Sequence, residues 1–526
     1  MKSTRLILIC LTLFGSLSTA GAAVRLPHVF GDGMVLQREK PVPVWGWAAP
    51  GEKVIVRFAA QQQSATAAAD GAWMVRLKPL KADDKPQQLT IAGANTIVFK
   101  NVLVGDVWLC SGDFGAYWEV FAALDAANEI ASADYPSMRL LKVTAKTSNA
   151  PLQDIQGSWM TCSPKTVNGF SALAYFFGRT LHRELKVPIG LIDCSYRYSY
   201  TRSWMAPEGF QLIPELKEPR VRMDSWDSTT ATGQQSFDAV IAQVEKWLPQ
   251  AQQALRDEKP MPPQPLLPAP LTARDDNYNS IGELSVAYFG MIRPLIPFAM
   301  RGVIWSQGEN GTEANDRQHY MRGLSEGWRK AWGQGDFPFY FELLPQIGAP
   351  GTAPCSGDSW VALREGQIKS LSIPNSGMAV TFDVSDYMAD TRNRQDAGFR
   401  LALWALAKEH HKDIEYSGPL YRSHRVEGDS VIVSFGHSGG LMIGEKTGLA
   451  PVREMKTGTL KHFAIAGADK QWQWAEARIV GDTVVVRSDK VLAPIAVRYA
   501  WCSNPQGANL YNRAGLPAAP FRTDDW

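Results

Sequence analysis

Four carboxylates lie next to short apolar runs and are the residues of this chain best suited to acid–base chemistry. Asp113 follows the run VLVGDVWLC, Glu309 follows RGVIWSQG, and Asp386 and Asp390 follow GMAVTFDV. Two carboxyl groups that face one cleft can hydrolyse a glycosidic bond, one as general acid and the other as base or nucleophile. The sequence does not fix the distance between them. The alternative is therefore that they order loops as buried, hydrogen-bonded groups.

The elements that must position these carboxylates alternate between two patterns. Short apolar, strand-like runs are separated by helical patterns, which predict helices at residues 171–184, 317–332, 360–371 and 395–410. Strand–helix alternation predicts a parallel sheet covered on both faces, a three-layer α/β core. In such folds the chemistry lies at the carboxyl ends of the strands, so we expect the segments that follow the runs to meet in one cleft.

The sequence pattern divides the chain into four parts. Residues 1–23 are predicted to be a signal peptide, 24–100 an N-terminal β domain, 101–412 the α/β domain and 413–526 a C-terminal β domain. The fold class predicted is thus an α/β core flanked by β-sandwich-like domains. Within the core, near 220–280, an amphipathic stretch and a proline-rich stretch predict an excursion that ends in a stiff, extended linker.

The N-terminus carries the features of a secretory signal. Lys2 and Arg5 precede the apolar stretch LILICLTLF, and small residues up to Ala22 and Ala23 offer a cleavage site. The apolar stretch is too short to span a bilayer as a mature helix. We therefore expect a secreted or periplasmic protein that has no membrane anchor after cleavage.

Charge and cysteine content exclude several classes of partner. The chain has 54 Lys and Arg against 52 Asp and Glu, so loss of Lys2 and Arg5 leaves the mature chain balanced. A balanced chain does not favour a nucleic acid or an anionic membrane as partner. The cysteines that remain after cleavage are an odd, sparse set without metal-ligand spacing, which predicts neither a disulfide framework nor a zinc site.

Longer stretches of the chain resemble one known family. The segments HVFGDGMVLQREKPVPVWGWAAPGE, RGVIWSQGE, WGQGDFPF and GFRLALWALA are similar to those of the sialate O-acetylesterase family. The resemblance covers nearly all of the mature chain. It implies an SGNH-hydrolase-like central domain, removal of acetyl groups from carbohydrates as the ancestral activity, and no metal or organic cofactor.

The nucleophile block of that family departs from its pattern here. The family sequence resembles CSGQSNMEW, whereas this chain has CSGDFGAYW, in which Trp118 matches and Phe114 occupies the position of the serine. A phenyl ring has no lone pair to attack an ester and no proton to lose. Ser111 lies a few residues earlier in an extended segment and is interpreted as a structural hydroxyl.

The oxyanion-binding positions are also substituted. Where the family resembles SSWGG, this chain has Arg197 and Tyr198 in place of the two glycines, and both side chains should crowd a backbone donor. Where the family resembles WYQGESNA, Gly311 occupies the position of the asparagine. The neighbouring Asn310 could restore an amide if the loop rearranged by one residue.

The acid–base block of the family, which resembles DIHPKNKQEVGRRLA, has lost its histidine. Asp390 occupies that position and Met388 the position of the aspartate, and no histidine lies within residues 383–408. The ordinary pKa of an aspartate is far below that of imidazole, and without a serine Asp390 has nothing to activate.

For two further motifs a structural interpretation is simpler than a functional one. The sequence GHSGG at residues 436–440 matches G-x-S-x-G, but the glycine-broken sequence after it does not predict the helix of a hydrolase elbow, so we expect a hairpin turn. His410 and His411 end a predicted helix, where we expect a solvated, dipole-compatible pair rather than ligands.

Two functions stay open at this point. The first is a carbohydrate-related protein that has lost serine catalysis and binds glycans, with Asp113, Trp118, Tyr198, Gln307 and Glu309 as candidate binding residues. The aromatic members of this set could stack on sugar rings or simply pack over a filled pocket. The second is an active carbohydrate O-acetylesterase or other glycan hydrolase that uses Asp113, Glu309 or Asp390.

Overall fold

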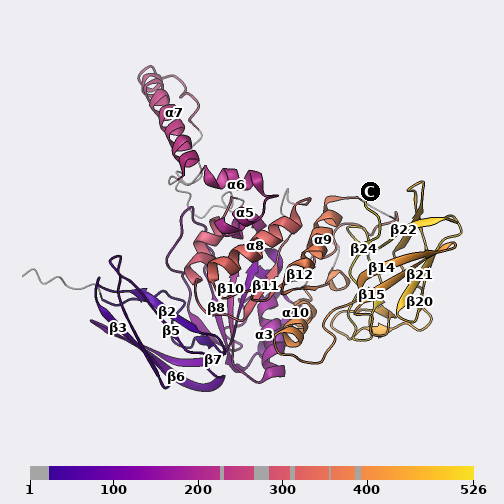
Figure 1. Ribbon diagram of the computed structural model, residues 1–526, viewed down its shortest axis with the longest axis horizontal. Helices are drawn as coiled ribbons and strands as arrows, with labels where there is room; N and C mark the ends of the chain where they lie inside the picture. The colour runs from indigo at the N-terminus through magenta and orange to yellow at the C-terminus, as the bar shows by residue number, and fades with distance from the viewer. Residues whose placement is uncertain (1–22, 226–229, 266–282, 309–313, 355–356, 386–391) are drawn as a thin grey trace, which may run out of the picture.

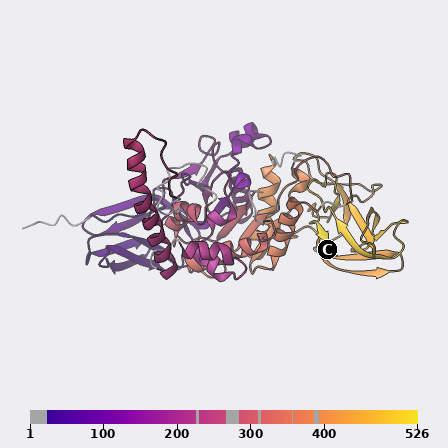
Figure 2. The same ribbon diagram turned by 90° about the horizontal axis from the view of Figure 1, so that it is seen from above.

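The computed structural model describes residues 23–225, 230–265, 283–308, 314–354, 357–385 and 392–526, except for the side chain of Phe114. N-terminal β structure, a central α/β body and C-terminal β structure follow one another along the long axis (Figure 1). The view from above shows the same order (Figure 2). Residues 1–22, nearly all of the predicted signal peptide, lie outside the described residues.

The N-terminal β structure consists of short, mostly antiparallel strands. Along β3 (Lys53–Phe58) buried and solvent-facing side chains alternate, as expected for a strand with one covered face. β3 pairs with β4 and β6, and β2 pairs with β5. The bounds are Val35–Gln37 (β1), Val42–Trp47 (β2), Gln61–Thr66 (β4), Ala72–Leu77 (β5) and Asp83–Ala92 (β6). The sequence of β4, QQQSAT, has no apolar alternation, so its pairing with β3 and not its own pattern makes it a strand.

One long strand joins this region to the central body. β7 (Thr96–Gly112) is 17 residues long, partly exposed at its start and buried throughout from Val102 onward. Its first part pairs antiparallel with β6, and its last part is a central strand of the parallel sheet. A strand buried on both faces suits a parallel sheet covered by helices. β7 thus continues across the boundary that the sequence places between residues 100 and 101.

The predicted parallel sheet is confirmed. Its order is β13-β12-β11-β7-β10-β8-β9, and every neighbouring pair is parallel except β8 with β9. The bounds are Tyr135–Lys142 (β8), Trp159–Cys162 (β9), Ile189–Ser195 (β10), Gly302–Ser306 (β11), Phe339–Glu342 (β12) and Ser376–Ala379 (β13). The carboxyl ends of the parallel strands meet at one edge, where the substituted family blocks follow.

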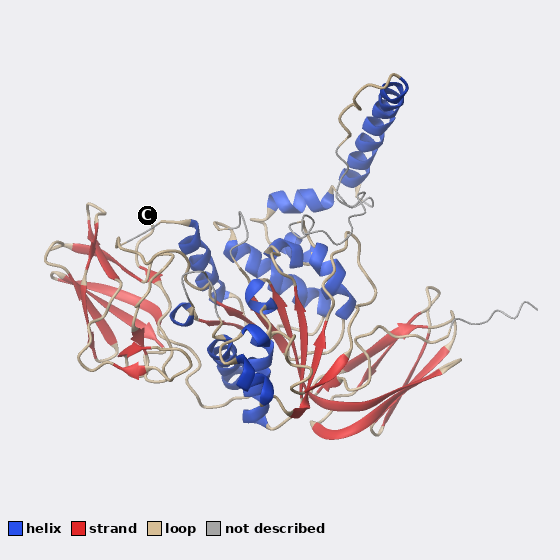
Figure 3. Cartoon of the chain, turned by 180° about the vertical axis from the view of Figure 1, so that it is seen from behind, coloured by secondary structure: helices blue, strands red, loops and turns tan. Residues whose placement is uncertain are grey.

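Alternate residues of the sheet contact different helices, which gives three layers (Figure 3). Trp108 and Tyr340 cluster with apolar residues of α3 and α10, whereas Leu109 and Trp305 cluster with those of α5 and α8. The predicted helices correspond to α3 (Ala172–Leu185), α8 (Arg317–Trp332), α9 (Ser359–Lys369) and α10 (Arg394–Lys408). Shorter helices are α1 (Phe114–Tyr117), α2 (Ala126–Ala131), α4 (Thr201–Trp204), α5 (Pro207–Leu212) and α6 (Lys217–Asp224). The predicted α/β fold class with β structure at both ends is confirmed.

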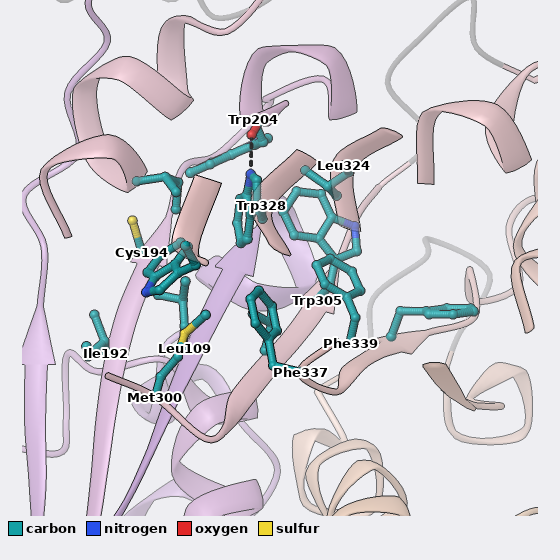
Figure 4. Packing of buried hydrophobic residues seen from close by; sticks show 14 of the residues in the cluster. Leu109, Ile192, Cys194, Trp204, Met300, Trp305, Leu324, Trp328, Phe337 and Phe339 are labelled. Carbon is teal, nitrogen blue, oxygen red and sulfur yellow. Dashed lines mark hydrogen bonds between the residues drawn. The ribbon is translucent and has the colours of Figure 1, made fainter. Parts of the chain in front are cut away.

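An aromatic cluster holds α8 against the sheet (Figure 4). The ring of Trp305 meets those of Trp204 and Trp328 edge to face, each at a centroid distance of 6.0 Å. Trp328 Nε1 donates to the backbone oxygen of Trp204 at 2.7 Å, so a buried indole N–H has its acceptor. This packing fixes the segment that leaves β11 toward the candidate site.

The expectation of a solvated histidine pair after α10 is wrong for His410. Its side chain is buried, and its Nε2 lies 3.5 Å from Asp106 Oδ2. Burial lowers the pKa of His410 to about 4, against the attraction of the Asp106 carboxylate. The sequence shows a helix end but not the buried charge cluster onto which that end folds.

The segment after α6 extends away from the central body. α7 (Ala231–Arg256) projects outward, as Figures 1 and 3 show. Its half-buried Trp247 donates from Nε1 to the backbone oxygen of Pro262 at 3.1 Å, so the returning chain runs back along the helix. Among the described helices, none combines the length and the hydropathy needed to cross a bilayer.

The C-terminal β structure contains three antiparallel sheets, of order β14-β15-β21-β20, β17-β16-β23 and β19-β18-β22-β24. The bounds are Leu420–Glu427 (β14), Ser430–Gly436 (β15), Met442–Glu445 (β16), Arg453–Glu454 (β17), Phe463–Gly467 (β18), Trp472–Trp474 (β19), Glu476–Val480 (β20), Thr483–Arg487 (β21), Pro494–Tyr499 (β22), Leu510–Tyr511 (β23) and Phe521–Arg522 (β24). The GHSGG turn links β15 to β16, which belong to different sheets. It is therefore not the expected hairpin, and a strand rather than a helix follows it.

Candidate functional site

The predicted nucleophile block lies at the carboxyl end of β7. The strand ends at Gly112, and α1 begins at Phe114. Asp113 N donates to Ser306 O at 2.8 Å, and a Cβ on Gly112 would lie 2.0 Å from that same oxygen. Only glycine allows β7 and β11 to approach so closely here. The strand therefore ends in a tight turn and a short helix follows at once, while the side chain of Phe114 lies outside the described part of the structure.

The second block lies beside the first because β10 and β7 pair in parallel. Ser195 is in register with Gly112, and Arg197 and Tyr198 follow it. The guanidinium of Arg197 lies 4.7 Å from the centroid of the Tyr198 ring. Tyr198 has φ +63°, a left-handed conformation that favours glycine, and its side chain is 46% exposed. The backbone at position 198 thus keeps the conformation that the family's glycine pattern leads one to expect.

The third block begins at the end of β11, where Trp305, Ser306 and Gln307 are buried. Gln307 Nε2 donates to Ser199 O at 2.7 Å, so this candidate binding residue joins two loops. A Cβ on Gly308 would lie 2.7 Å from Asp113 Oδ2, which places the Asp113 carboxylate, itself 1% exposed, against that backbone. The predicted residues Glu309 and Gly311 lie outside the described residues, as does Asp390 of the fourth block.

The remaining aromatic candidate has a partner within the protein. Trp118 Nε1 donates to Ala122 O at 3.0 Å, and Trp118 O accepts from Ala172 N at 2.8 Å. The half-buried indole therefore fixes the turn between α1 and the start of α3. This arrangement favours the packing alternative for Trp118 over sugar stacking.

A buried ion pair beneath α1 was not foreseen from the sequence. Arg394 Nη1 and Nη2 lie 2.9 and 3.2 Å from the two carboxylate oxygens of Glu342, which also accepts from Ser306 Oγ at 2.8 Å. A Cβ on Gly115 would lie 2.1 Å from Ser306 Oγ, so α1 packs directly on this group. The available signal was a single glutamate at the end of the otherwise apolar run FPFYFELL. A carboxylate paired bidentately with arginine is charge-compensated rather than poised as an acid or base.

A second buried carboxylate lies at the end of β10. Ser195 Oγ donates to Asp193 Oδ1 at 2.6 Å. Burial raises the pKa of Asp193 to about 6, partly offset by the hydrogen bond from Ser195 and by the charge of Lys142. The hydroxyl of Ser111 donates to Cys194 O at 2.7 Å, which agrees with a structural role for that residue.

No imidazole joins these groups in the described part of the chain. The eight histidines of the sequence all fall in described segments, and no hydrogen bond connects any of them to a serine hydroxyl. Three or more His, Cys, Asp or Glu side chains do not come together in a metal-binding arrangement among the described residues. The described part of the carboxyl edge therefore contains buried carboxylates, serines and an arginine, without a serine–histidine pair.

Comparison with known proteins relates both sequence and fold to one family. No family model matches the chain. The sialate O-acetylesterases of Mus musculus and Homo sapiens are each 25% identical to it, over 96% of this chain and 95% and 93% of theirs. A crystal structure of a carbohydrate acetylesterase from Xanthomonas citri has a TM-score of 0.77 and 30% identity, covering 96% of this chain and 100% of that one. The chain therefore belongs to the carbohydrate acetylesterases and is distantly homologous, over nearly its full length, to the sialate O-acetylesterases.

Proposed function

We propose that this protein is an exported, glycan-binding member of its family that has lost serine-type ester hydrolysis. The observation that carries the proposal is the position of Phe114, the first residue of α1 directly after the end of β7. The family resemblance assigns that position to the nucleophilic serine. Without an alcohol there, no acyl-enzyme can form at this position.

The absence of a serine–histidine pair among the described residues supports the proposal. A serine hydroxyl needs an adjacent base to become nucleophilic at neutral pH. Ser111 donates to a backbone carbonyl, and Ser306 donates to a carboxylate already paired with arginine. Neither is arranged to transfer its proton during an attack.

Retained glycan binding is supported by the relatives and by the exposed edge. The names of the similar proteins describe esterases that act on sialic acid or other carbohydrates. At the carboxyl edge the exposed ring of Tyr198 offers a face for a sugar ring. The predicted signal peptide at residues 1–23 supports export to a compartment where such glycans are found.

One observation favours the alternative, an active hydrolase. The hydroxyl of Ser195 donates a hydrogen bond to the carboxylate of Asp193, whose pKa is raised to about 6, close to that of imidazole. Such a dyad could in principle activate a serine. This second candidate therefore uses Ser195 and Asp193 rather than the substituted family positions.

Two measurements on the purified mature protein separate the candidates. We expect no turnover of 4-nitrophenyl acetate or of an O-acetylated sugar above a heat-denatured control, and no covalent labelling by a fluorophosphonate probe. Labelling that disappears in Ser195→Ala would establish the alternative and overturn the proposal. Turnover without labelling would reveal a hydrolase with a non-serine mechanism and would overturn the purely glycan-binding role in this proposal.

Reconstruction of the site tests the proposal from the opposite direction. Phe114→Ser combined with Asp390→His should remain inactive, because Arg197 and Tyr198 still occupy the oxyanion positions. Adding Arg197→Gly, Tyr198→Gly and Gly311→Asn to the same variant is the matched comparison and should yield measurable ester turnover. Activity of the double variant alone would contradict the steric role assigned to Arg197 and Tyr198.

A further inference from the structure

We propose that the junction between the central body and the C-terminal β structure binds a neutral oligosaccharide. A cavity of about 590 Å³ lies there, lined by residues of both parts. This volume lies in the range usual for small-molecule sites, which occur preferentially at such junctions. The inference rests on the proposed glycan-binding function and assigns it a site and a ligand class.

The cavity lies at the carboxyl edge of the parallel sheet. On the central side it is lined by Gln346, which follows β12, and by Phe382, Asp383 and Ser385, which follow β13. Ligands of open α/β sheets bind at this edge. A second cavity of about 470 Å³ shares Asp383 and Ser385 and is also lined by Arg392 and Asn393 at the start of α10. The two cavities therefore adjoin at Asp383 and Ser385.

The C-terminal wall of the cavity is held in place by direct contacts. Lys446 Nζ, on the loop after β16, lies 2.6 Å from Asp396 Oδ2 of α10. Asn393 Nδ2 donates to Gly448 O of the same loop at 3.1 Å. On the other side Tyr511 donates from its hydroxyl to Asp383 Oδ2 at 3.1 Å. These contacts fix both the loop after β16 and Tyr511 to the central body. The cavity is therefore preformed rather than created by binding.

Three of the four charged side chains of the lining are compensated within the protein, and the fourth, the exposed Lys461, has no ion pair among the described residues. Asp383 accepts from Arg400 at 2.6 and 2.8 Å, Lys446 pairs with Asp396, and Glu445 pairs with Arg453. The rest of the lining is rich in uncharged donors and acceptors: Thr457, Thr459, Gln506, Asn509 and the backbone at Gly458 and Gly507. Hydroxyls and amides both donate and accept hydrogen bonds, as the hydroxyls of a sugar require. Hydroxyl-rich sugar rings therefore suit most of this lining, and the ammonium group of Lys461 can also donate to a sugar hydroxyl.

Two glycines of the lining do not readily accept a larger residue. Gly507 has φ +88°, which disfavours any larger residue, and a Cβ on Gly458 would lie 3.2 Å from Met455 Cβ. The exposed Thr457 next to Gly458 is thus a position where added bulk enters the cavity without disturbing the core.

The test is isothermal titration calorimetry of the mature protein with cellohexaose, xylohexaose, mannohexaose and 3′-sialyllactose. We expect at least one neutral hexasaccharide to bind, and Thr457→Trp to weaken that binding by about tenfold or more. Thr66→Trp, the same change at an exposed position of β4 in the N-terminal region, is the matched control and should leave the affinity unchanged. Gln506→Ala, which removes an amide without adding bulk, should weaken binding as well and serves as a second variant if Thr457→Trp fails to fold.

Several outcomes would overturn the inference. They are failure of all the neutral sugars to bind, preference for sialyllactose, and neutral-sugar binding that is insensitive to both cavity variants but abolished by Tyr198→Ala. The last outcome would place the glycan in the substituted family site and leave the proposed function intact. Conversely, ester turnover together with binding that Thr457→Trp weakens would overturn the proposed loss of catalysis while the junction site stands.

Discussion

Two buried charge clusters, one toward each end of the central sheet, make an instructive contrast. Near the amino end Asp106, fully buried in β7, accepts from Arg38 at 3.0 and 2.9 Å and from Arg301 at 3.0 and 2.8 Å. At the carboxyl end Glu342 pairs with Arg394 alone. One carboxylate thus serves two guanidinium groups in the first cluster and a single one in the second.

The difference shows what each end of the sheet does. Although burial opposes ionisation, the hydrogen bond from Arg38 and the charges of both arginines hold the pKa of Asp106 below its usual range. This cluster fastens the N-terminal β structure and the end of α10 to the sheet, far from the cleft. The Glu342–Arg394 pair lies directly beneath α1, where chemistry would take place, and is just as fully paired. The ion pair at the candidate site is thus fully compensated, and its role is structural, as is that of the Asp106 cluster.

The largest effect is expected from Asp106→Ala. It leaves two buried arginines without their shared carboxylate, and removal of one partner of a buried ion pair costs about 3–5 kcal/mol. We expect a loss at the upper end of this range. In urea unfolding it should lower the midpoint and leave the dependence of the unfolding free energy on urea concentration unchanged. A loss of less than about 1 kcal/mol would mean that the cluster does not fasten the regions together.

Glu342→Met should have a smaller effect, because it takes the carboxylate away from a single buried guanidinium. We expect about 3 kcal/mol for the single variant and clear recovery in Glu342→Met/Arg394→Met, since an apolar pair can replace a buried ion pair at little cost. Chemical denaturation of both variants and of Arg394→Met completes the double-mutant cycle. If the double variant lost as much free energy of unfolding as the two single variants together, the pairing would be contradicted.

The contributions of Asp193 and His410 to stability, at opposite ends of the sheet, should also change in opposite directions with pH. Burial raises the pKa of Asp193 from 3.8 to about 6, so its contribution to stability is present below pH 3.8 and lost as the pH rises through 6. The pKa of His410 is lowered from 6.5 to about 4, so its contribution is present above pH 6.5 and lost as the pH falls through 4. Each shift corresponds to roughly 3 kcal/mol.

Variants separate these opposing contributions. Between pH 4 and 6.5, Asp193→Asn should remove the loss of stability on alkalinisation, and His410→Gln should remove the loss on acidification. Midpoints of urea unfolding across this range report both. Identical pH profiles for wild type and His410→Gln would show that folding does not lower the pKa of this imidazole.

The smallest effect is expected at the exposed edge. Tyr198→Gly relieves a left-handed backbone conformation, which costs a side-chain-bearing residue about 1 kcal/mol, but increases the entropy of the unfolded chain. A net stabilisation of up to about 0.5 kcal/mol is predicted. Arg197→Gly, at a neighbouring residue without a positive φ, is the control and should be neutral or destabilising. Equal destabilisation by both changes would argue against backbone strain at position 198.

The sequence predicts most of the elements because local patterns carry them. Four helices of the α/β body (α3, α8, α9 and α10) and the apolar strands of its sheet follow from periodicity that each segment shows by itself. Exceptions arise where neighbours decide the outcome. The strand QQQSAT forms because β3 offers a partner edge, and His410 is buried because Asp106 lies beneath the end of α10.

The residues of the candidate site also fall into those that the sequence predicts and those that only the structure reveals. Alignment with the family pattern identified the substitutions at positions 114, 197, 198, 311 and 390, because they follow the ends of recognisable strands. Glu342 and Arg394 were missed, since residues 52 apart in sequence carry no local sign that they will form a pair. Gln307 and Trp118 were identified, but only the structure shows that their polar groups hold loops together.

The sequence by itself determined the α/β class with its β flanks and the replacement of an alcohol by a phenyl ring at the end of β7, since residue type and periodicity are local properties. The tertiary structure alone decided which charges neutralise one another and where a cavity remains between the central body and the C-terminal sheets. Ion pairing and cavity shape depend on the distances between residues remote in sequence, and the packing of the whole chain sets those distances.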